Sequence, residues 1–288
     1  MKNDFLKIVF SKKYLNLFFL AIILLLTVIV YFKSLNNQFL NDWDDGVYIT
    51  NNDDIKSDDA AKKAFTGFSN GHYHPLTTLS YIAEYNLFGL NPKPYHTTNL
   101  ILHILNAFLV FAFVWLLVKQ SLVAFITALL FTIHPMHVES VAWISDRKDL
   151  LCTLFYVGAL CTYIIYRRDK NIKLYAVTFL LFGLALFSKA MAITLPVLFF
   201  VVDYFMGKKV SKKSLIEKLP FLVLSVIFGY ISIISQKSNA ALGDFNTVGF
   251  FEKIMFSSYS VVMYLVKLFS FSGLSAFYNY PLTENGKY

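Results

Sequence analysis

Three carboxylates crowd into four consecutive positions early in the chain, at Asp42, Asp44 and Asp45. They follow a long apolar segment, and charged side chains beside a membrane are costly unless they have a task. A close carboxylate pair at a membrane–water boundary suits a general base, a metal ligand or a proton relay. The alternative is an ordinary acidic loop. The other polar residues of the chain help to choose between these interpretations.

Basic side chains recur in later polar turns, at Arg147, Lys148 and Lys189. A positive group that faces carboxylates suits an anionic headgroup, and arginine can hold a phosphate through two parallel hydrogen bonds. We therefore expect Arg147 and Lys189, and to a lesser degree Lys148, to contact a phosphate. The alternative is that they are interface anchors whose charged ends reach water.

Histidines and one glutamate accompany these basic residues and are expected to give polar contacts to a substrate: His74, His134, His137 and Glu139. His72 and His74 are two positions apart, and His134 and His137 are three apart, so neither pair matches the HExxH zinc pattern, and Pro75 and Pro135 interrupt a helix beside them. No metal site is predicted from histidine. The DxD triplet formed by Asp42 and Asp44 leaves a weaker alternative, a divalent cation held near a phosphate.

The composition indicates an all-α polytopic membrane protein, because 57% of the residues are hydrophobic and only 15% are charged. No nucleotide-binding glycine motif or CxxC pair is present. The net charge of +8 is explained by the distribution of basic residues among loops, so no nucleic-acid partner is predicted. Cys152 and Cys161 lie about half a helical turn out of phase, so neither a disulfide nor a metal site is expected from them.

Apolar runs of about 20 residues predict membrane helices, and the chain is expected to form about eight. A long polar loop, residues 33–95, follows the first span and is expected to carry short interfacial helices near 65–68 and 76–88. The expected organisation is a tail at 1–13, a membrane domain at 14–271 and a C-terminal tail at 272–288. The predicted spans are 14–32, 97–118, 121–133, 150–166, 174–187, 191–206, 219–235 and 254–271.

Alternation of these spans predicts which loops share a side of the membrane. The N-terminus, Lys119 and the turns at 167–173 and 207–218 share one side and concentrate lysine and arginine in short loops. The positive-inside rule makes that side cytoplasmic. The acidic loop is then extracytoplasmic, facing a periplasm, the cell exterior or a secretory lumen.

Several blocks of sequence resemble the opening of the polytopic GT-C glycosyltransferases. The similarity is greatest to the transmembrane O-mannosyltransferase family that carries C-terminal tetratricopeptide repeats, including its bacterial relatives, and more distant to the protein O-mannosyltransferases. The blocks that carry the resemblance are Trp43-Asp44-Asp45, HPLTTLSY at 74–81, GLNPKPYHTTNLILHILN at 89–106, LLFTIHPMHVESVAWISDRKDLL at 129–151, FSKAMAITLPVLFFVVDY at 187–204 and LSAFYNYP at 274–281.

The resemblance implies a GT-C-type bundle that takes a polyprenyl- or dolichyl-phosphate-linked sugar, such as mannose, as donor. The acceptor would be a hydroxyl of a protein or glycan, and transfer would occur on the extracytoplasmic face without a cofactor. The family's acidic pair corresponds to Asp44, the expected general base, and Asp45. Its basic positions correspond to Arg147 and Lys189. The family continues into repeats, whereas no 34-residue period occurs here, so the chain is expected to be truncated or a minimal form.

Two other classes of function remain open. A transporter or channel could use Asp42, Asp44 and Asp45 as an ion or proton relay, but relay carboxylates usually lie within spans. The predicted spans hold almost none, since Asp203 lies at a helix end. A non-catalytic scaffold of a glycan-assembly complex is the other alternative. The position of the carboxylates favours the enzyme over the transporter.

Overall fold

The computed structural model describes residues 2–209, 211–238, 249–275 and 278, and in these residues it is built of helices with no strand. Among the described residues, four helical segments are long and apolar enough to cross a membrane, and a bent pair makes a fifth candidate. Their residues are mostly aliphatic and aromatic, and the apolar surfaces that they expose suit lipid. The four long helices are α1 (Lys2–Tyr31), α4 (Pro92–Val118), α7 (Arg147–Asp169) and α10 (Lys212–Ser238).

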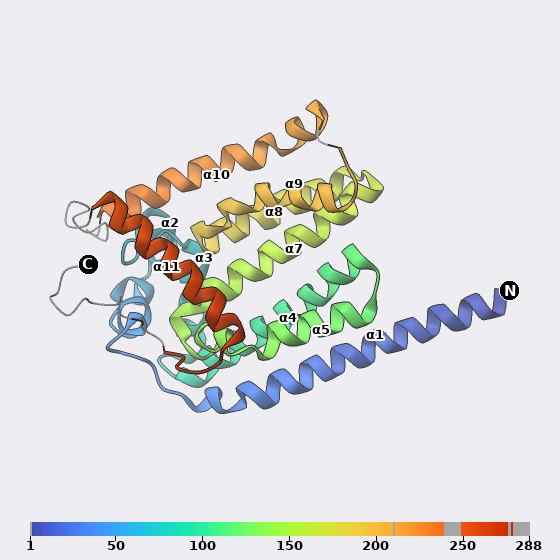
Figure 1. Ribbon diagram of the computed structural model, residues 1–288. Coiled ribbons are helices and arrows are strands. Elements are labelled where there is room, and N and C mark those ends of the chain that lie inside the picture. The colour runs from blue at the N-terminus through green and yellow to red at the C-terminus, as the bar shows by residue number, and fades with distance from the viewer. Residues whose placement is uncertain (1, 210, 239–248, 276–277, 279–288) are drawn as a thin grey trace.

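Helix α7 lies at the centre of the bundle. It packs against α4 on one side and against α8 (Ile172–Ser188) on the other, while α1 packs along α5 (Ser121–Ile133). Figure 1 shows the N-terminal end of α1 projecting from the bundle, with the first loop gathered at the opposite end. Aliphatic and aromatic side chains fill the core beside α7, where the rings of Tyr163 and Phe199 stack with centroids 4.2 Å apart.

Both ends of α7 are held by a buried arginine. At its C-terminal end Arg167 pairs with Asp203, 2.6 Å away, and with Glu217, 2.9 Å away. Lys218 completes this network through the second oxygen of Asp203 at 2.6 Å. Arg147, which is also buried, lies at the N-terminal end of α7. Because a buried charge is tolerated only when it is paired, these residues fix the ends of the central helix.

Two apolar segments are broken at polar residues. Helix α5 and the segment 135–142, which contains η4 (Pro135–His137) and α6 (Val138–Ala142), meet at an angle of 54° beside Pro135. Pro135 has no N–H to continue the helical hydrogen bonds. Helix α8 ends at Ser188, and η6 (Ala190–Thr194) and α9 (Leu195–Phe205) follow an extended Lys189. These breaks bring polar residues to the end of the bundle where the first loop lies.

The first loop is a compact group of short helices at that end (Figure 1). Its elements are η1 (Phe32–Asn36), η2 (Gly46–Thr50), η3 (Asp53–Lys56), α2 (Ala60–Thr66) and α3 (Pro75–Phe88). The chain turns back on itself directly after the acidic cluster, and a Cβ atom at Gly46 would lie 2.2 Å from the carbonyl oxygen of Asn41. Only glycine fits this turn without a shift of the backbone.

The expected count of about eight spans exceeds the four or five that length and composition support in the described residues. Helices α8 and α9 have only 17 and 11 residues. Helix α11 (Phe250–Phe269) contains Glu252, Lys253 and Lys267, buries no residue fully and crosses the bundle obliquely (Figure 1). The expected tail at 1–13 is helical from Lys2 onward, and most of the expected tail at 272–288 lies outside the described residues.

Candidate active site

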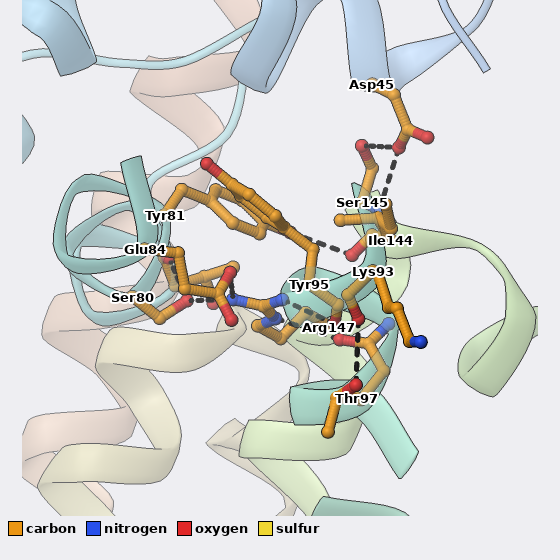
Figure 2. Close-up of polar contacts among 12 residues, drawn as sticks. Asp45, Ser80, Tyr81, Glu84, Lys93, Tyr95, Thr97, Ile144, Ser145 and Arg147 are labelled. Atoms are coloured by element: carbon orange, nitrogen blue, oxygen red, sulfur yellow. Dashed lines mark hydrogen bonds and ion pairs between the residues drawn. The ribbon is translucent and has the colours of Figure 1, made fainter. Parts of the chain in front are cut away.

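The two adjacent aspartates differ sharply in their surroundings. Asp45 is 1% exposed, and its carboxylate accepts hydrogen bonds from the backbone N–H of Leu40 and Ser145, each at 2.9 Å, and from the hydroxyl of Ser145. Figure 2 shows Asp45 pointing at Ser145. Asp44 instead keeps 31% of its side chain exposed. Asp45 therefore ties the first loop to the turn before α7, and Asp44 is the carboxylate that a substrate can reach.

Asp44 faces Lys148, whose ammonium nitrogen lies 3.5 Å from its Oδ2 atom. Lys148 is the second residue of α7 and lies beside two aromatic rings, 5.3 Å from the centroid of Tyr48 and 5.7 Å from that of Trp143. Trp43 meets Trp143 edge to face with centroids 5.4 Å apart. A cation near aromatic faces is held in place without losing its charge.

A second ion pair lies in the same region, between Lys189 and Asp149. Both side chains are about 30% exposed, so the pair is open to solvent on one side. Asp149 lies in the first turn of α7, where a negative charge is favoured by the helix dipole. Thr77 of α3 donates to the carbonyl oxygen of Ser188 at 3.1 Å and so fixes the extended residue Lys189.

Two histidines border this group of charges. Burial, together with the positive charges of Lys148 and Lys189, lowers the pKa of His72, against the opposing effect of Asp44. Burial is also the main cause that lowers the pKa of His74 to about 3, with Lys148, His72 and Lys189 adding to it. Both imidazoles are therefore neutral at physiological pH. His72 is exposed and can exchange hydrogen bonds with a sugar or phosphate, whereas His74 is 5% exposed and its Nε2 atom is buried. Neither imidazole adds a charge.

Arg147 departs from its expected place at the open site. It is fully buried, and its Nε donates to Asn99 at 2.8 Å while its terminal nitrogens donate to Ser80, Glu84 and the carbonyl oxygen of Tyr95. Figure 2 shows the guanidinium between α3, which carries Ser80 and Glu84, and Tyr95. Because Arg147 is fully buried and makes four hydrogen bonds, one of them the ion pair to Glu84, it has no open face for a phosphate.

His134, His137 and Glu139 belong to a different part of the same end. His134 contacts the carbonyl oxygen of Leu268 in α11 at 3.0 Å, and His137 packs on Phe131 with ring centroids 4.5 Å apart. Glu139 is exposed on α6. The contacts of these histidines fasten the bend after α5 and the end of α11. Their role towards a substrate stays a prediction.

The described residues contain no cluster of three or more histidine, cysteine, aspartate or glutamate side chains that could hold a metal ion. Asp42 is exposed, and Asp44 pairs with a lysine. The DxD alternative therefore rests on the spacing of Asp42 and Asp44 alone. Cys152 and Cys161 are both buried and free.

Sequence reasoning missed Glu84, the carboxylate that pairs with Arg147. Its signal was present, because Glu84 is the only charged residue in α3, an otherwise apolar and weakly polar helix. A lone carboxylate on such a helix needs a buried partner. Ser145, which holds Asp45, carried no comparable signal, since a serine before a helix is common.

Residues 86–235 match the family described as dolichyl-phosphate-mannose-protein mannosyltransferase. The chain is similar to protein O-mannosyl-transferase TMTC1 of Mus musculus, with 34% identity over 145 residues that cover 46% of this chain and 15% of that protein. It is similar to protein O-mannosyl-transferase F38B6.6 of Caenorhabditis elegans, with 33% identity over 171 residues, covering 54% and 24%.

A third relative is protein O-mannosyl-transferase TMTC2 of Mus musculus, with 28% identity over 180 residues that cover 61% of this chain and 22% of the relative. The matches thus span less than a quarter of the length of each relative. No solved structure matches the chain. Since the family match covers more than half of the chain and includes α7 with the turns on both sides of it, the protein belongs to the dolichyl-phosphate-mannose-protein mannosyltransferase family.

Proposed function

We propose that the protein transfers a sugar, mannose by the name of its family, from a polyprenyl- or dolichyl-phosphate-linked donor to the hydroxyl of a protein or glycan. The observation that carries the proposal is the open carboxylate of Asp44, 3.5 Å from Lys148 and beside the Lys189–Asp149 pair. One general base and two cations within one region suit a reaction in which a hydroxyl loses a proton while a phosphate leaves.

The proposed reaction is a direct displacement at the anomeric carbon. Asp44 accepts the proton of the acceptor hydroxyl as its oxygen forms a bond to that carbon. The bond between the anomeric carbon and the phosphate oxygen breaks, and the lipid phosphate leaves with the bonding electrons. Lys148 and Lys189 stabilise the negative charge that develops on it. The apolar helix surfaces beside the site would hold the lipid chain.

Of the three basic residues expected to contact a phosphate, Lys148 and Lys189 keep that role in this proposal and Arg147 does not. Their ammonium groups are partly exposed, and each is paired with a carboxylate that a phosphate could replace. Lysine binds phosphate as a point charge and needs no bidentate geometry. His72, neutral and exposed beside these cations, suits a contact with the sugar hydroxyls.

The experiment that tests the proposal uses the purified protein in lipid vesicles with a radiolabelled mannosyl-phosphoryl polyprenol and an acceptor peptide rich in serine and threonine. We expect label on the peptide.

Lys148→Met and Lys189→Met keep the apolar stem of the side chain and remove its charge. Each should raise the donor KM about tenfold or more, because each loses one hydrogen bond to a charged group. Lys93→Met, at an exposed position in the first turn of α4 that takes part in neither ion pair, is the control. Parent-like donor KM values in both lysine variants would refute the phosphate assignment.

We also propose that the site faces away from the cytoplasm, supported by the basic residues in the loops at the other end of the bundle. Asn51 and Lys119 are both exposed, and they lie in the first loop and in the turn between α4 and α5. In intact cells, or in intact secretory vesicles opened only on the lumenal side, a membrane-impermeant maleimide should label Asn51→Cys. It should label Lys119→Cys only after the cytoplasmic side is opened. The reverse pattern would invert the orientation.

A further inference from the structure

Helix α3 carries a polar stripe that bonds to three other segments. Thr77, Tyr81 and Glu84 recur at the helical spacing of three or four residues, so they share one face. The hydroxyl of Thr77 donates to the carbonyl oxygen of Ser188 at 3.1 Å. The hydroxyl of Tyr81 donates to the carbonyl oxygen of Ile144, also at 3.1 Å. Glu84 pairs with Arg147. The residues that follow two of these contacts are Lys189 and Lys148, the two cations of the candidate site.

The Glu84–Arg147 pair is more elaborate than packing requires. Arg147 is fully buried and lies over the ring of Tyr81, 4.9 Å from its centroid, besides its hydrogen bonds to Ser80, Asn99 and Tyr95. A pair of apolar side chains would fill the same space, often with equal stability. Apolar side chains would not fix an orientation, because their contacts have no preferred direction. The planar guanidinium, held by several hydrogen bonds, fixes the angle of the backbone that carries it.

That backbone also carries Lys148. Arg147 and Lys148 are the first two residues of α7, and their side chains separate there: one enters the protein and the other reaches Asp44. Any rotation of the first turn of α7 would therefore move the Lys148 ammonium away from Asp44. Asp45 accepts hydrogen bonds from Ser145, which lies two residues before Arg147. This contact fixes the turn that leads into α7.

We propose that Glu84 and Arg147 are positioning residues, which hold Lys148 opposite Asp44 by fixing the first turn of α7 against α3. Neither side chain touches the substrate. The effect on turnover rests on the proposed transferase function, whereas the effect on the position of Lys148 does not. Misplacement of a charged group by about 1 Å can cost a reaction roughly a hundredfold.

The test is a double-mutant cycle between Glu84→Gln and Lys148→Met. Glu84→Gln keeps the shape and one acceptor oxygen but removes the charge that orients Arg147. We expect it to lower kcat about tenfold or more in the parent chain and less than about threefold when Lys148 is already methionine, because a positioning residue has nothing left to position. Equal losses in both backgrounds would refute the proposal.

The matched control is Glu217→Gln at the opposite end of α7. Glu217 also pairs with a buried arginine, Arg167, at 2.9 Å, and its loss should affect stability without coupling to Lys148. If Glu217→Gln coupled to Lys148→Met as strongly as Glu84→Gln does, any loosening of α7 would have the same effect on turnover. That result would refute the proposal. If Glu84→Gln does not fold, Ser80→Ala removes a single 3.2 Å bond to Arg147 and should give a smaller effect with the same coupling.

A second readout needs no turnover. In a chain with Cys152→Ala and Cys161→Ala, the alkylation rate of Lys148→Cys reports how firmly this position is held. Glu84→Gln should raise that rate about threefold or more, and Glu217→Gln should leave it unchanged. An unchanged rate in Glu84→Gln would overturn the positioning role even in an active enzyme. If the parent transfers no sugar, the proposed function fails while the alkylation rates still decide the role of Glu84.

Discussion

Asp44→Asn should reduce sugar transfer by at least about a hundredfold while the donor still binds, because asparagine keeps the shape of the side chain and a hydrogen-bonding oxygen but cannot accept the proton. The structure sharpens this expectation. Asp44 is the more exposed member of the acidic pair, whereas the carboxylate of Asp45 accepts hydrogen bonds from Leu40 and Ser145. The measurement is kcat with labelled donor at saturation, together with the donor dissociation constant by equilibrium binding.

Asp42→Asn is the matched control for Asp44→Asn. Asp42 is exposed two residues away, so the same change of charge should alter transfer by less than about twofold. Near-normal transfer by Asp44→Asn would contradict the general-base mechanism. Equal losses at Asp42 and Asp44 with activity that a chelator abolishes would instead support a bound divalent cation.

The sequence predicted the long helices because their signal is local. Runs of aliphatic and aromatic residues in α1, α4, α7 and α10 are close to the length that crosses a membrane, whatever their neighbours are. The expected span at 254–271 is not among the helices apolar enough to cross a membrane, because α11 carries Glu252 and Lys253 in its first turn and Lys267 in its last, and the helix lies obliquely. Average hydrophobicity does not distinguish such an amphipathic helix from a span.

The difference in burial between Asp44 and Asp45 could not be predicted from the sequence. Both are aspartates in one short acidic stretch, and the partners that bury Asp45 include the backbone and hydroxyl of Ser145, 100 positions later. Burial of one carboxylate depends on tertiary contacts that leave no periodic pattern in the chain. The resemblance to a family indicated the pair, and the structure distinguishes the anchoring carboxylate from the exposed one.

Arg147 is a residue whose expected partner and observed partner differ. Its residue type and its place in a polar turn suggested a phosphate ligand, since arginine is the side chain that best binds phosphate. The structure gives it a carboxylate instead, Glu84, 63 positions earlier. Residue chemistry alone does not distinguish these partners, because a carboxylate and a phosphate satisfy a guanidinium in the same way. The lone carboxylate in α3 was the signal that could have separated them.

Arg147→Met should therefore act first on stability. It leaves Glu84, which is 6% exposed, as a buried carboxylate without its cation, and it removes donors from Asn99 and from the carbonyl oxygen of Tyr95. Breaking one side of a buried ion pair costs about 3–5 kcal/mol. Thermal unfolding in detergent can be followed with a thiol-reactive dye, because the two free cysteines, Cys152 and Cys161, are buried until the bundle opens.

The control for this prediction removes both charges. In Arg147→Met combined with Glu84→Gln no buried charge is left without a partner, so the double variant should unfold at a higher temperature than Arg147→Met alone. Lys189→Met, whose ion pair is about 30% exposed, should change the unfolding temperature little, because an exposed pair contributes little to stability. A phosphate-binding Arg147 would give the reverse result: parent-like unfolding of Arg147→Met with weakened donor binding. The unfolding temperature of this one variant thus separates an arginine that holds the first turn of α7 from one that holds the substrate.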